Sequence, residues 1–347
     1  MEKSSSRTVT KTVFSNQLSF YSLVPEAKEL FKKTLPKMTG IGYSSVLTKG
    51  NIKRHENSEI LTVFVNSKLN KSLLDRLPKL KLICCMSTGF DNVDLEECRR
   101  RKIAVANVPA YGENTVAEHS FALILNLSRK VHLAFERTTR GNFSTKGLTG
   151  WDLKGKTIGI VGAGRIGWHV ARIAKGFGMN IIANNPTVEQ EWVKEFNCQF
   201  VSLEELLRTS DVVSLHCPLL PSTFHLINKK NIRSMKKNAI LINTARGGIV
   251  DTAALSWALD RKLIAGAGLD VLENENLVKE ETQVFFQHLS QTQKDSLLLE
   301  YRMLNRPNVI ITPHNAFNSK EALQRILDET LSNIVAFQRG KKQNRII

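Results

Sequence analysis

The chain has 347 residues, of which 42% are hydrophobic and 23% charged, a composition that suits two globular domains of roughly 100–200 residues each. No apolar run approaches the roughly 20 residues of a membrane-spanning helix, and the N-terminal residues lack the apolar core of a secretory signal. The sequence therefore predicts a cytoplasmic protein without a membrane partner. The formal net charge is +17, but the basic residues are scattered without interleaved aromatics, which predicts a basic surface and no nucleic-acid partner.

The chain contains five cysteines: Cys84, Cys85, Cys98, Cys198 and Cys217. Their number is odd and their spacing does not match that of metal ligands, so we expect free thiols and predict no metal site. Cys84 and Cys85 lie within an apolar run, which indicates a buried strand rather than a reactive pair.

The first third of the chain alternates short β-rich runs with helical stretches, a pattern typical of βαβ units and a parallel sheet. Its predicted strands are 8–14, 60–65, 82–86 and 103–106, and its predicted helices are 25–35, 71–74 and 95–101. A helical pattern then runs from 114 to 137, with Asn114 or Thr115 as N-cap and Glu118 completing a capping box from Thr115. A helix of about 24 residues would span roughly 36 Å.

A second, denser series of the same kind follows. Its predicted strands are 157–161, 180–183, 212–216, 240–244, 265–269 and 309–312, and its predicted helices are 166–177, 188–195, 203–208, 252–259 and 319–339. We expect the last helix to return the chain to the first domain. The segment 276–307 is the weakest, with helical propensity around 280–288 and 295–303.

A glycine-rich turn, Gly162-x-Gly164-x-x-Gly167, lies between a predicted strand and an amphipathic helix. The first glycine permits a tight turn, the second lets a pyrophosphate approach the backbone, and the third allows the helix to pack closely on the strand. The helix N-terminus supplies free N–H groups and a partial positive charge for the phosphates. This order of elements predicts a dinucleotide-binding domain.

One part of the dinucleotide pattern is different. At the end of the second strand of such a domain, an NAD-preferring site normally has Asp or Glu for the adenine-ribose hydroxyls, but here the residue is Asn185. Asn185 can hydrogen-bond but cannot repel a 2′-phosphate, and no Arg lies nearby in sequence to attract one. The residues alone therefore leave the choice between NAD and NADP open.

Arg246, Glu275 and His314 each follow a predicted strand of the second series. Ligands of open α/β sheets bind at the carboxyl ends of the strands. Arginine can bind the carboxylate of a 2-keto acid bidentately, and histidine can donate the proton that the reduced carbonyl oxygen needs. A carboxylate would fix the tautomer of that histidine.

Each of these residues also has an ordinary structural interpretation: a surface cation, a solvated loop charge and a packed histidine. Their joint placement favours the catalytic interpretation. The other histidines lack such partners in sequence and are interpreted as structural: His55, His119, His132, His169, His216, His225 and His288.

From about residue 12 to 339 the chain resembles the D-isomer-specific 2-hydroxyacid dehydrogenases, most closely the fermentative D-lactate dehydrogenases of bacteria. The stretches that carry the resemblance are STGFDNVDLE (87–96), NVPAYGENTVAEHSFALIL (107–125), NFSTKGLTGWDLKGKTIGIVGAGRIG (142–167), DVVSLHCPL (211–219), LINTARGGIVD (241–251), GLDVLENE (268–275) and TPHNAF (312–317). Several motifs in order, at consistent spacing, make the resemblance specific.

The resemblance implies an α/β fold of two doubly wound, parallel-sheet (Rossmann-like) domains with the active site in the cleft between them. Residues 111–315 would form the NAD-binding domain, and residues 1–110 with 316–347 a discontinuous substrate domain. It also implies a homodimer or larger homo-oligomer that pairs through the cofactor domain, with the predicted helix 114–137 as candidate contact surface.

By matching positions, the resemblance implies that Arg246 binds the substrate carboxylate and that His314 is the acid–base residue, with Glu275 as its partner. The implied cofactor contacts are Gly162, Gly164, Arg165, Ile166, Gly167, Asn185, Cys217, Pro218, Thr223, Thr244, Ala245, Arg246 and Asp270. The implied substrate contacts are Thr88, Gly89, Tyr111, Arg246 and Phe317. Aromatic residues at 111 and 317 favour a small substrate such as pyruvate.

The leading hypothesis from the sequence is reversible, NADH-dependent reduction of pyruvate to D-lactate, with NADP possible because of Asn185. The first alternative is an NAD(P)-dependent reductase of another 2-keto acid, such as phenylpyruvate, 2-ketoisocaproate or hydroxypyruvate. The second, from a different class, is an NAD-sensing corepressor; the basic charge favours it mildly, whereas the three catalytic residue types favour an enzyme.

Overall fold

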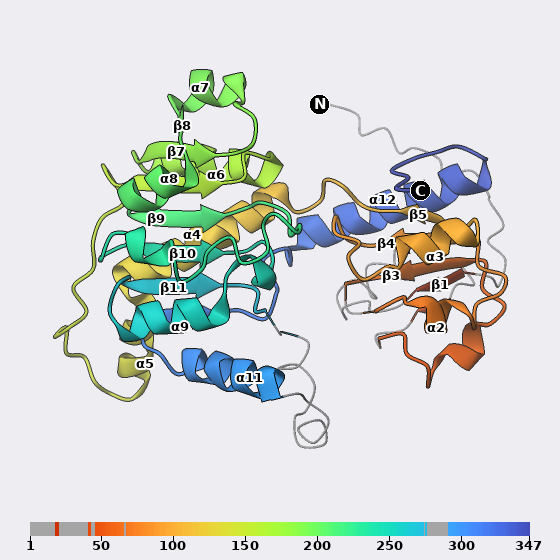
Figure 1. Ribbon diagram of the computed structural model, residues 1–347, viewed down its shortest axis with the longest axis horizontal. Coiled ribbons are helices and arrows are strands. Elements are labelled where there is room, and N and C mark those ends of the chain that lie inside the picture. The colour runs from red at the N-terminus through yellow and green to blue at the C-terminus, as the bar shows by residue number, and fades with distance from the viewer. Residues whose placement is uncertain (1–17, 21–40, 43–45, 66, 274, 276–290) are drawn as a thin grey trace, which may run out of the picture. The chain divides into compact units, whose positions relative to one another are not determined.

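The computed structural model describes residues 18–20, 41–42, 46–65, 67–273, 275 and 291–347 (Figure 1). The predicted strand 8–14 and the predicted helical segments 25–35 and 280–288 lie outside these residues. The chain forms two compact units: unit 1 comprises residues 1–111 and 319–347, and unit 2 comprises residues 112–318.

Unit 1 contains a parallel sheet of five strands in the order β2-β1-β3-β4-β5. The strands are β1 (Leu18–Phe20), β2 (Ile41–Gly42), β3 (Ile60–Val63), β4 (Leu82–Cys85) and β5 (Ala104–Ala106). The helices are the 3-10 turn η1 (Ile52–His55), α2 (Lys71–Leu74), α3 (Leu95–Arg100) and α12 (Lys320–Gln338). β3, β4 and β5 are buried along their whole length, as expected for strands covered on both faces.

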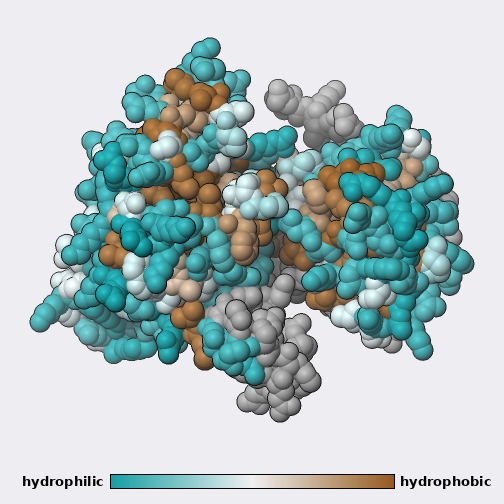
Figure 2. Space-filling model, viewed as in Figure 1, coloured by the Kyte–Doolittle hydropathy of each residue, from teal (hydrophilic) through white to brown (hydrophobic). Residues whose placement is uncertain are grey.

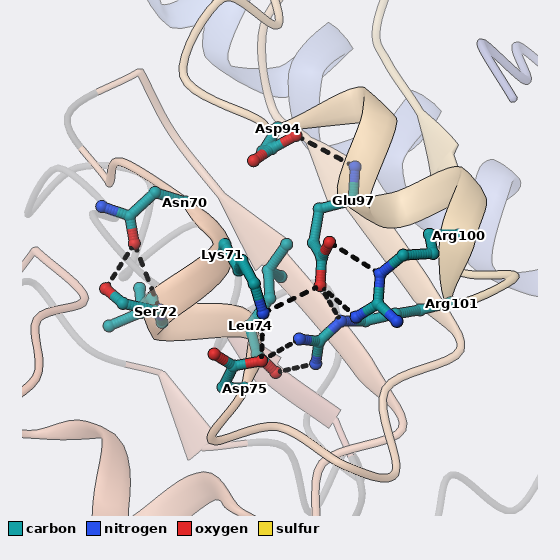
Figure 3. A network of polar contacts seen from close by, with 10 residues as sticks. Asn70, Lys71, Ser72, Leu74, Asp75, Asp94, Glu97, Arg100 and Arg101 are labelled. Atoms are coloured by element: carbon teal, nitrogen blue, oxygen red, sulfur yellow. Dashed lines mark hydrogen bonds and ion pairs between the residues drawn. The ribbon is translucent and has the colours of Figure 1, made fainter.

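Helices α2 and α3 are joined by a network of charged side chains (Figure 3). The Glu97 carboxylate accepts hydrogen bonds from Arg100 Nε at 2.9 Å and Arg101 Nε at 2.6 Å. Arg101 continues to α2, where its Nη1 donates to Leu74 O at 2.7 Å and its Nη2 pairs with Asp75. The hydrogen bonds from the two guanidinium groups lower the pKa of Glu97 to about 2.

Unit 2 contains a parallel sheet of seven strands in the order β12-β11-β10-β9-β6-β7-β8 (Figure 1). The strands are β6 (Thr157–Val161), β7 (Asn180–Asn184), β8 (Gln199–Phe200), β9 (Val212–Leu215), β10 (Ile240–Asn243), β11 (Gly266–Leu269) and β12 (Val309–Ile311). The helices are α4 (Glu113–Arg129), α5 (Val131–Thr139), α6 (Arg165–Gly176), α7 (Gln190–Phe196), α8 (Leu203–Thr209), η2 (Ile232–Ser234), η3 (Gly247–Ile249), α9 (Thr252–Asp260) and α11 (Gln291–Leu304).

Alternate side chains of the unit 2 strands enter two separate cores, one on each face of the sheet. Ile240 and Ile242 pack in the core that includes residues of α4, α6 and α7, whereas Leu241 packs in the core that includes residues of α8 and α9. Helices therefore cover both faces of a parallel sheet, and the prediction of a doubly wound α/β fold is confirmed.

The predicted single helix over 114–137 is wrong. Lys130 adopts a left-handed conformation (φ 54°, ψ 36°) and separates α4 from α5. The side chain of Asn126 accepts the backbone N–H of His132 at 2.8 Å, and the Ser128 carbonyl accepts the N–H of Trp151 at 3.0 Å. Groups that would continue one helix are thus bonded to other partners.

The predicted capping box is also wrong. Helix α4 begins after Gly112, which makes no side-chain cap, and Glu118 accepts a hydrogen bond from the Asn114 side chain at 2.5 Å. The pair Asn114–Glu118 spans one turn of the helix surface, where i and i+4 side chains meet.

All five cysteines are free thiols, as expected. Cys84 and Cys85 lie in β4 and are buried, which confirms the predicted buried strand, and burial raises the pKa of Cys85 to about 12. The face shown in Figure 2 is mostly hydrophilic on both units. Among the described residues, no helix is both long and apolar enough to span a bilayer.

Candidate active site

The predicted site residues of unit 2 follow six strands of its sheet. The glycine turn follows β6, Asn185 follows β7, Cys217 and Pro218 follow β9, Thr244 to Arg246 follow β10, Asp270 follows β11, and His314 follows β12. Because every pair in this sheet is parallel, all these carboxyl ends lie at one edge. The sheet order therefore brings together residues that are up to about 150 positions apart in sequence.

The glycine turn has the geometry that its sequence predicts. Gly162 has φ +100°, a left-handed conformation that side chains rarely adopt. A Cβ at Gly167 would lie 2.4 Å from the carbonyl oxygen of Gly162, so the third glycine is needed for close packing of α6. A Cβ at Gly164, the N-cap of α6, would meet nothing within 4 Å, so open space lies in front of the helix N-terminus. These residues fit a dinucleotide pyrophosphate.

The turn lies where the strand order reverses. β6 is flanked by β7 on one side and by β9 on the other. The strands up to β8 are added on the first side of β6, and the strands from β9 onward are added on the second side. A Cβ at Gly162 would lie 2.7 Å from the backbone nitrogen of Cys217, which places the ends of β6 and β9 in direct contact. A dinucleotide site is expected at such a switch point. Thr223, in the loop after β9, donates to Pro218 O at 2.6 Å and accepts the N–H of Leu220 at 2.7 Å, which holds that loop closed.

Asn185 connects the end of β7 to the glycine turn. Its Oδ1 accepts the backbone N–H of Ala163 at 3.1 Å, and its Nδ2 donates to the carbonyl and hydroxyl oxygens of Thr187, each at 3.1 Å. Thr187 in turn donates to the carboxylate of Glu189 at 2.8 Å. A neutral amide therefore stands where an NAD-preferring site normally has a carboxylate.

Two other residues lie in the glycine-turn region. Arg165, the first residue of α6, has an exposed side chain whose Nη1 lies 3.3 Å from Glu113 Oε1. Beyond β9, the ring of His216 is bonded through Nε2 to Ser214 Oγ at 2.8 Å. Burial lowers the pKa of His216 to about 3, so this ring is neutral at physiological pH.

The turn after β10 is shaped by a buried asparagine. Asn243 Oδ1 accepts the N–H of Ala245 at 3.1 Å, and Asn243 Nδ2 donates to the carbonyl of Arg246 at 2.9 Å. Thr244 Oγ1 lies 2.9 Å from Ser120 Oγ in α4. The three predicted residues of this turn are thus held by hydrogen bonds at both of its ends, and the guanidinium of Arg246 donates through Nη1 to the carbonyl of Ala245 at 2.9 Å.

His314 and Glu275 form the pair that the sequence predicts. His314 Nδ1 lies 2.8 Å from Glu275 Oε1, and both side chains are about one-fifth exposed, at 19% and 24%. A carboxylate bonded to Nδ1 leaves Nε2 as the nitrogen that can exchange a proton with a ligand.

The buried carboxylate of Asp270 fixes the loop that carries His314. It accepts hydrogen bonds from Thr312 Oγ1 at 2.5 Å and from the N–H groups of Asn315 and Ala316 at 3.0 and 2.9 Å. The Asp270 carbonyl accepts the N–H of His314 itself at 2.8 Å. His314 has φ 54°, so this loop holds it in a conformation that non-glycine residues seldom adopt.

Besides His216, several histidines that the sequence left without partners have them in the structure, and His119 and His225 lie close to carboxylates. His119 Nε2 lies 3.0 Å from Thr312 Oγ1 and 3.5 Å from Asp270 Oδ1, although 193 residues separate it from Thr312. His225 Nε2 lies 2.7 Å from Glu273 Oε1. No sequence signal predicts the contact of His119. The partner of His225 is Glu273, which belongs to the same GLDVLENE motif as Glu275, so the motif offered a second glutamate that could pair with a histidine.

The turn of Arg246 packs directly on the segment that carries Glu275. A Cβ at Gly247 would lie 2.0 Å from the carbonyl oxygen of Leu272, so only glycine permits this approach. Residues 270–273 are therefore held on one side by the β10 turn and on the other by the loop of His314, whose N–H is bonded to the Asp270 carbonyl. The sequence motif did not reveal this role of Gly247.

The predicted substrate contacts occur in both units. In unit 1, Thr88 and Gly89 follow β4 in an exposed to half-buried loop, and Tyr111 is the last residue before unit 2, with its carbonyl accepting a hydrogen bond from Arg325 Nε at 2.7 Å. In unit 2, Phe317 lies near the start of α4, since a Cβ at Gly112 would be 3.8 Å from Phe317 Cβ.

Comparison with known proteins adds the family. Residues 121–316 match the model of the NAD-binding domain of D-isomer-specific 2-hydroxyacid dehydrogenases. The chain is 36% identical to the D-lactate dehydrogenase of Escherichia coli, over 86% of this chain and 89% of that protein. It is 39% identical to the glyoxylate reductase of Thermococcus litoralis, over 82% and 81%.

A solved structure agrees with the sequence relatives. The D-lactate dehydrogenase of Aquifex aeolicus, in complex with NAD and lactic acid, superimposes with a TM-score of 0.83 at 36% identity, over 93% of this chain and 96% of that chain. Fold, strand-end residues and comparisons agree: the chain belongs to the D-isomer-specific 2-hydroxyacid dehydrogenase family and is an NAD-dependent oxidoreductase of 2-hydroxy acids.

Proposed function

We propose that this dehydrogenase reduces pyruvate to D-lactate, reversibly, and that Arg246, Glu275 and His314 are its catalytic residues. The observation that carries the proposal is the His314–Glu275 pair, 2.8 Å apart, at the carboxyl edge of the sheet that also carries Arg246. D-lactate dehydrogenases among the relatives support this substrate.

The bound nicotinamide would supply the hydride that reduces the carbonyl carbon. Gly162, Gly164 and Gly167 would hold its pyrophosphate at the N-terminus of α6. Arg246 binds the substrate carboxylate with its guanidinium group, and His314 donates the proton that the carbonyl oxygen takes up. Glu275 keeps Nδ1 of His314 bonded, so that Nε2 carries the proton to be donated.

The remaining cofactor contacts are proposed around the same strand ends. They are Arg165, Ile166, Asn185, Cys217, Pro218, Thr223, Thr244, Ala245 and Asp270. The proposed substrate contacts beside Arg246 are the backbone of Thr88 and Gly89 and the side chains of Tyr111 and Phe317. Two aromatic side chains favour a substrate with a methyl group over one with a long side chain.

The test of the substrate is a panel of 2-keto acids assayed with NADH: pyruvate, glyoxylate, hydroxypyruvate, phenylpyruvate and 2-ketoisocaproate. Pyruvate is expected to give the highest kcat/KM, and D-lactate the product. A higher kcat/KM for glyoxylate, the substrate named for one relative, would make glyoxylate the assigned substrate and leave the proposed chemistry unchanged. Turnover of none of the acids at micromolar enzyme would favour the NAD-sensing corepressor.

The test of the catalytic pair is His314→Ala. Loss of the general acid is expected to lower kcat by roughly 10²–10⁴-fold with little change in NADH affinity. The matched control is His225→Gln, which alters the other histidine–glutamate pair of unit 2 and should retain kcat within about threefold. Nearly full activity of His314→Ala, or an equal loss in both variants, would refute the assignment.

The proposal extends to NADPH as a second reductant. The neutral Asn185 repels no 2′-phosphate, and its amide is already bonded to Ala163 and Thr187, so it does not select strongly for a free ribose hydroxyl. Steady-state kinetics with NADH and NADPH side by side test this. A preference for NADH above about 1,000-fold would contradict it.

We also propose a cytoplasmic homodimer or larger homo-oligomer. Helix α5 has no buried residue, and Phe135 and Phe143 are 70% and 80% exposed, which leaves an apolar surface for a second copy. The candidate surface is thus α5 with residues 140–147, not one long helix from Asn114. Sedimentation at micromolar concentration should give at least a dimer, and a monomer would refute the assembly. The five free thiols support the reducing cytoplasm.

A further inference from the structure

The loop after β4 carries two backbone amides that have no acceptor in the described part of the chain. Among the described residues, nothing accepts a hydrogen bond from the N–H of Thr88 or of Gly89. Thr88 is exposed and Gly89 half-buried, so both groups can reach a ligand. Adjacent backbone N–H groups without a protein acceptor can together bind an anion such as a carboxylate.

The direction in which each of these N–H groups points is set by the carbonyl group of the same peptide unit. In a trans peptide the C=O and the following N–H point in opposite directions, and no cis peptide occurs in the described residues. The carbonyl of Ser87 accepts the N–H of Val108 at 3.1 Å, which turns the N–H of Thr88 away from Val108. The carbonyl of Thr88 accepts Asn107 Nδ2 at 2.8 Å, which turns the N–H of Gly89 away from Asn107.

Asn107 is itself held on both sides of its backbone. Its N–H donates to the carbonyl of Asn344 at 3.1 Å, and its carbonyl accepts Asn333 Nδ2 at 2.8 Å. Asn107 and Asn333 are 7% and 2% exposed, so water does not compete for these bonds.

The same chain of bonds continues into the last residues. Asn344 Nδ2 donates to Asn333 Oδ1 at 2.9 Å and to Glu329 Oε1 at 2.5 Å. Next to it, the N–H of Ile346 donates to the carbonyl of Val105 at 2.8 Å, so the segment pairs with β5 at the edge of the sheet. Asn344, Asn333 and Asn107 together are called the asparagine chain below.

We infer that the asparagine chain positions the substrate-binding amides: it connects α12 and residues 344–347 to the peptide plane of Thr88 and Gly89 and aims the Gly89 N–H at the substrate carboxylate. Asn107 acts through this peptide and is a positioning residue. The inference rests on the proposed function, in which the Thr88–Gly89 backbone binds that carboxylate.

The experiment compares Asn107→Ala, Asn333→Ala and Gln343→Ala in the full chain. Asn107→Ala removes the donor to the Thr88 carbonyl and frees the peptide plane. Asn333→Ala leaves that donor in place and loosens only its support. Gln343→Ala is the matched control: Gln343 bonds to Ser332 at 2.7 Å and shares Glu329 Oε1 with Asn344 at 3.0 Å, but among the described residues it makes no bond to Asn344, Asn333 or Asn107 themselves.

The expected result is a selective loss of carboxylate binding. The KM for pyruvate should rise about tenfold in Asn107→Ala and about threefold in Asn333→Ala, with kcat and the NADH Kd within twofold of the wild type. The preference for pyruvate over methyl pyruvate, which lacks the free carboxylate, should fall by the same factors. Gln343→Ala should change neither KM nor this preference.

Three outcomes would overturn the inference: a KM within twofold in both asparagine variants, an unchanged preference for pyruvate over its ester, or equal changes in KM, kcat and NADH Kd, which indicate a general defect of folding. If Asn107→Ala does not fold, the threefold effect of Asn333→Ala decides alone. Failure of the wild type to reduce any 2-keto acid would instead refute the proposed function.

Discussion

Asn185→Asp tests directly how the protein chooses its cofactor. The carboxylate retains an oxygen that can accept the Ala163 N–H, now 3.1 Å from Asn185 Oδ1, but it cannot donate to Thr187 as Nδ2 does. It also places a negative charge at the end of β7, where the adenine-ribose hydroxyls are expected. The variant should therefore favour NADH over NADPH more strongly than the wild type does.

The magnitude follows from the environment of the residue. Two unit charges 4 Å apart repel by about 1 kcal/mol in bulk water and about 4 kcal/mol at an effective dielectric constant of 20. Asn185 is half-buried, so a value of about 2 kcal/mol applies, which is near thirtyfold in kcat/KM for NADPH. A gain for NADH adds to the change in ratio, because a carboxylate accepts stronger hydrogen bonds from hydroxyl groups than an amide does.

The assay is the ratio of kcat/KM for NADH and NADPH at saturating pyruvate. Asn185→Ala is the control: it removes the bonds to Thr187, as Asp does, and also the bond to Ala163, without adding charge, so its ratio should stay within about threefold of the wild type. An unchanged ratio in Asn185→Asp, or an equal change in both variants, would show that the charge at this position does not select the cofactor.

Three further changes have outcomes set by the structure. Gly162→Ala should cost at least about 2 kcal/mol in urea unfolding and abolish NADH binding, because φ is +100° and the new Cβ would meet the β9 end at 2.7 Å; Gly176→Ala, with open space around it in α6, should be neutral or stabilising. Glu275→Gln should lower kcat about tenfold with unchanged NADH affinity, because an amide stabilises a protonated imidazole less than a carboxylate does. Glu97→Gln should destabilise the protein above pH 4.5, and the difference should shrink as the pH falls toward 2 in urea titrations. The reason is that the pKa of Glu97 is about 2 in the folded state and 4.5 in the unfolded state. The stability that the ionised carboxylate contributes through Arg100 and Arg101 is therefore lost as the pH falls from 4.5 to 2.

The local elements of the fold could be predicted from the sequence because their signals are local. The strand–glycine–helix order around Gly162 fixes both the turn and the start of α6, and each of the strands predicted between 157 and 312 is present within a residue or so of its expected ends. Placing Arg246 and His314 at one sheet edge also follows, since parallel strands share their carboxyl edge.

Contacts between distant segments could not be predicted in this way. The break at Lys130 depends on Trp151, whose N–H binds the carbonyl of Ser128. The hydrophobic periodicity of the helix carries no information about this contact. The contact of His119 with Thr312 and the bond between Asn344 and Asn333 likewise depend on which segments the fold brings together. The sequence indicates residue types near the site, but the hydrogen bonds that orient them are decided by tertiary packing.

The two histidine–glutamate pairs of unit 2 illustrate this difference. His314 and His225 both have left-handed backbones, at φ 54° and 49°, and each ring lies 2.7–2.8 Å from a glutamate of the same short segment. His225 follows an exposed loop and stacks on Phe224, with ring centroids 4.0 Å apart, so one face of its imidazole is covered. His314 follows β12, and the buried Asp270 fixes its loop at the edge that carries the glycine turn and Arg246. Pairing with a carboxylate is therefore not enough to make a histidine catalytic; the position at the strand ends is what makes His314, and not His225, the expected proton donor.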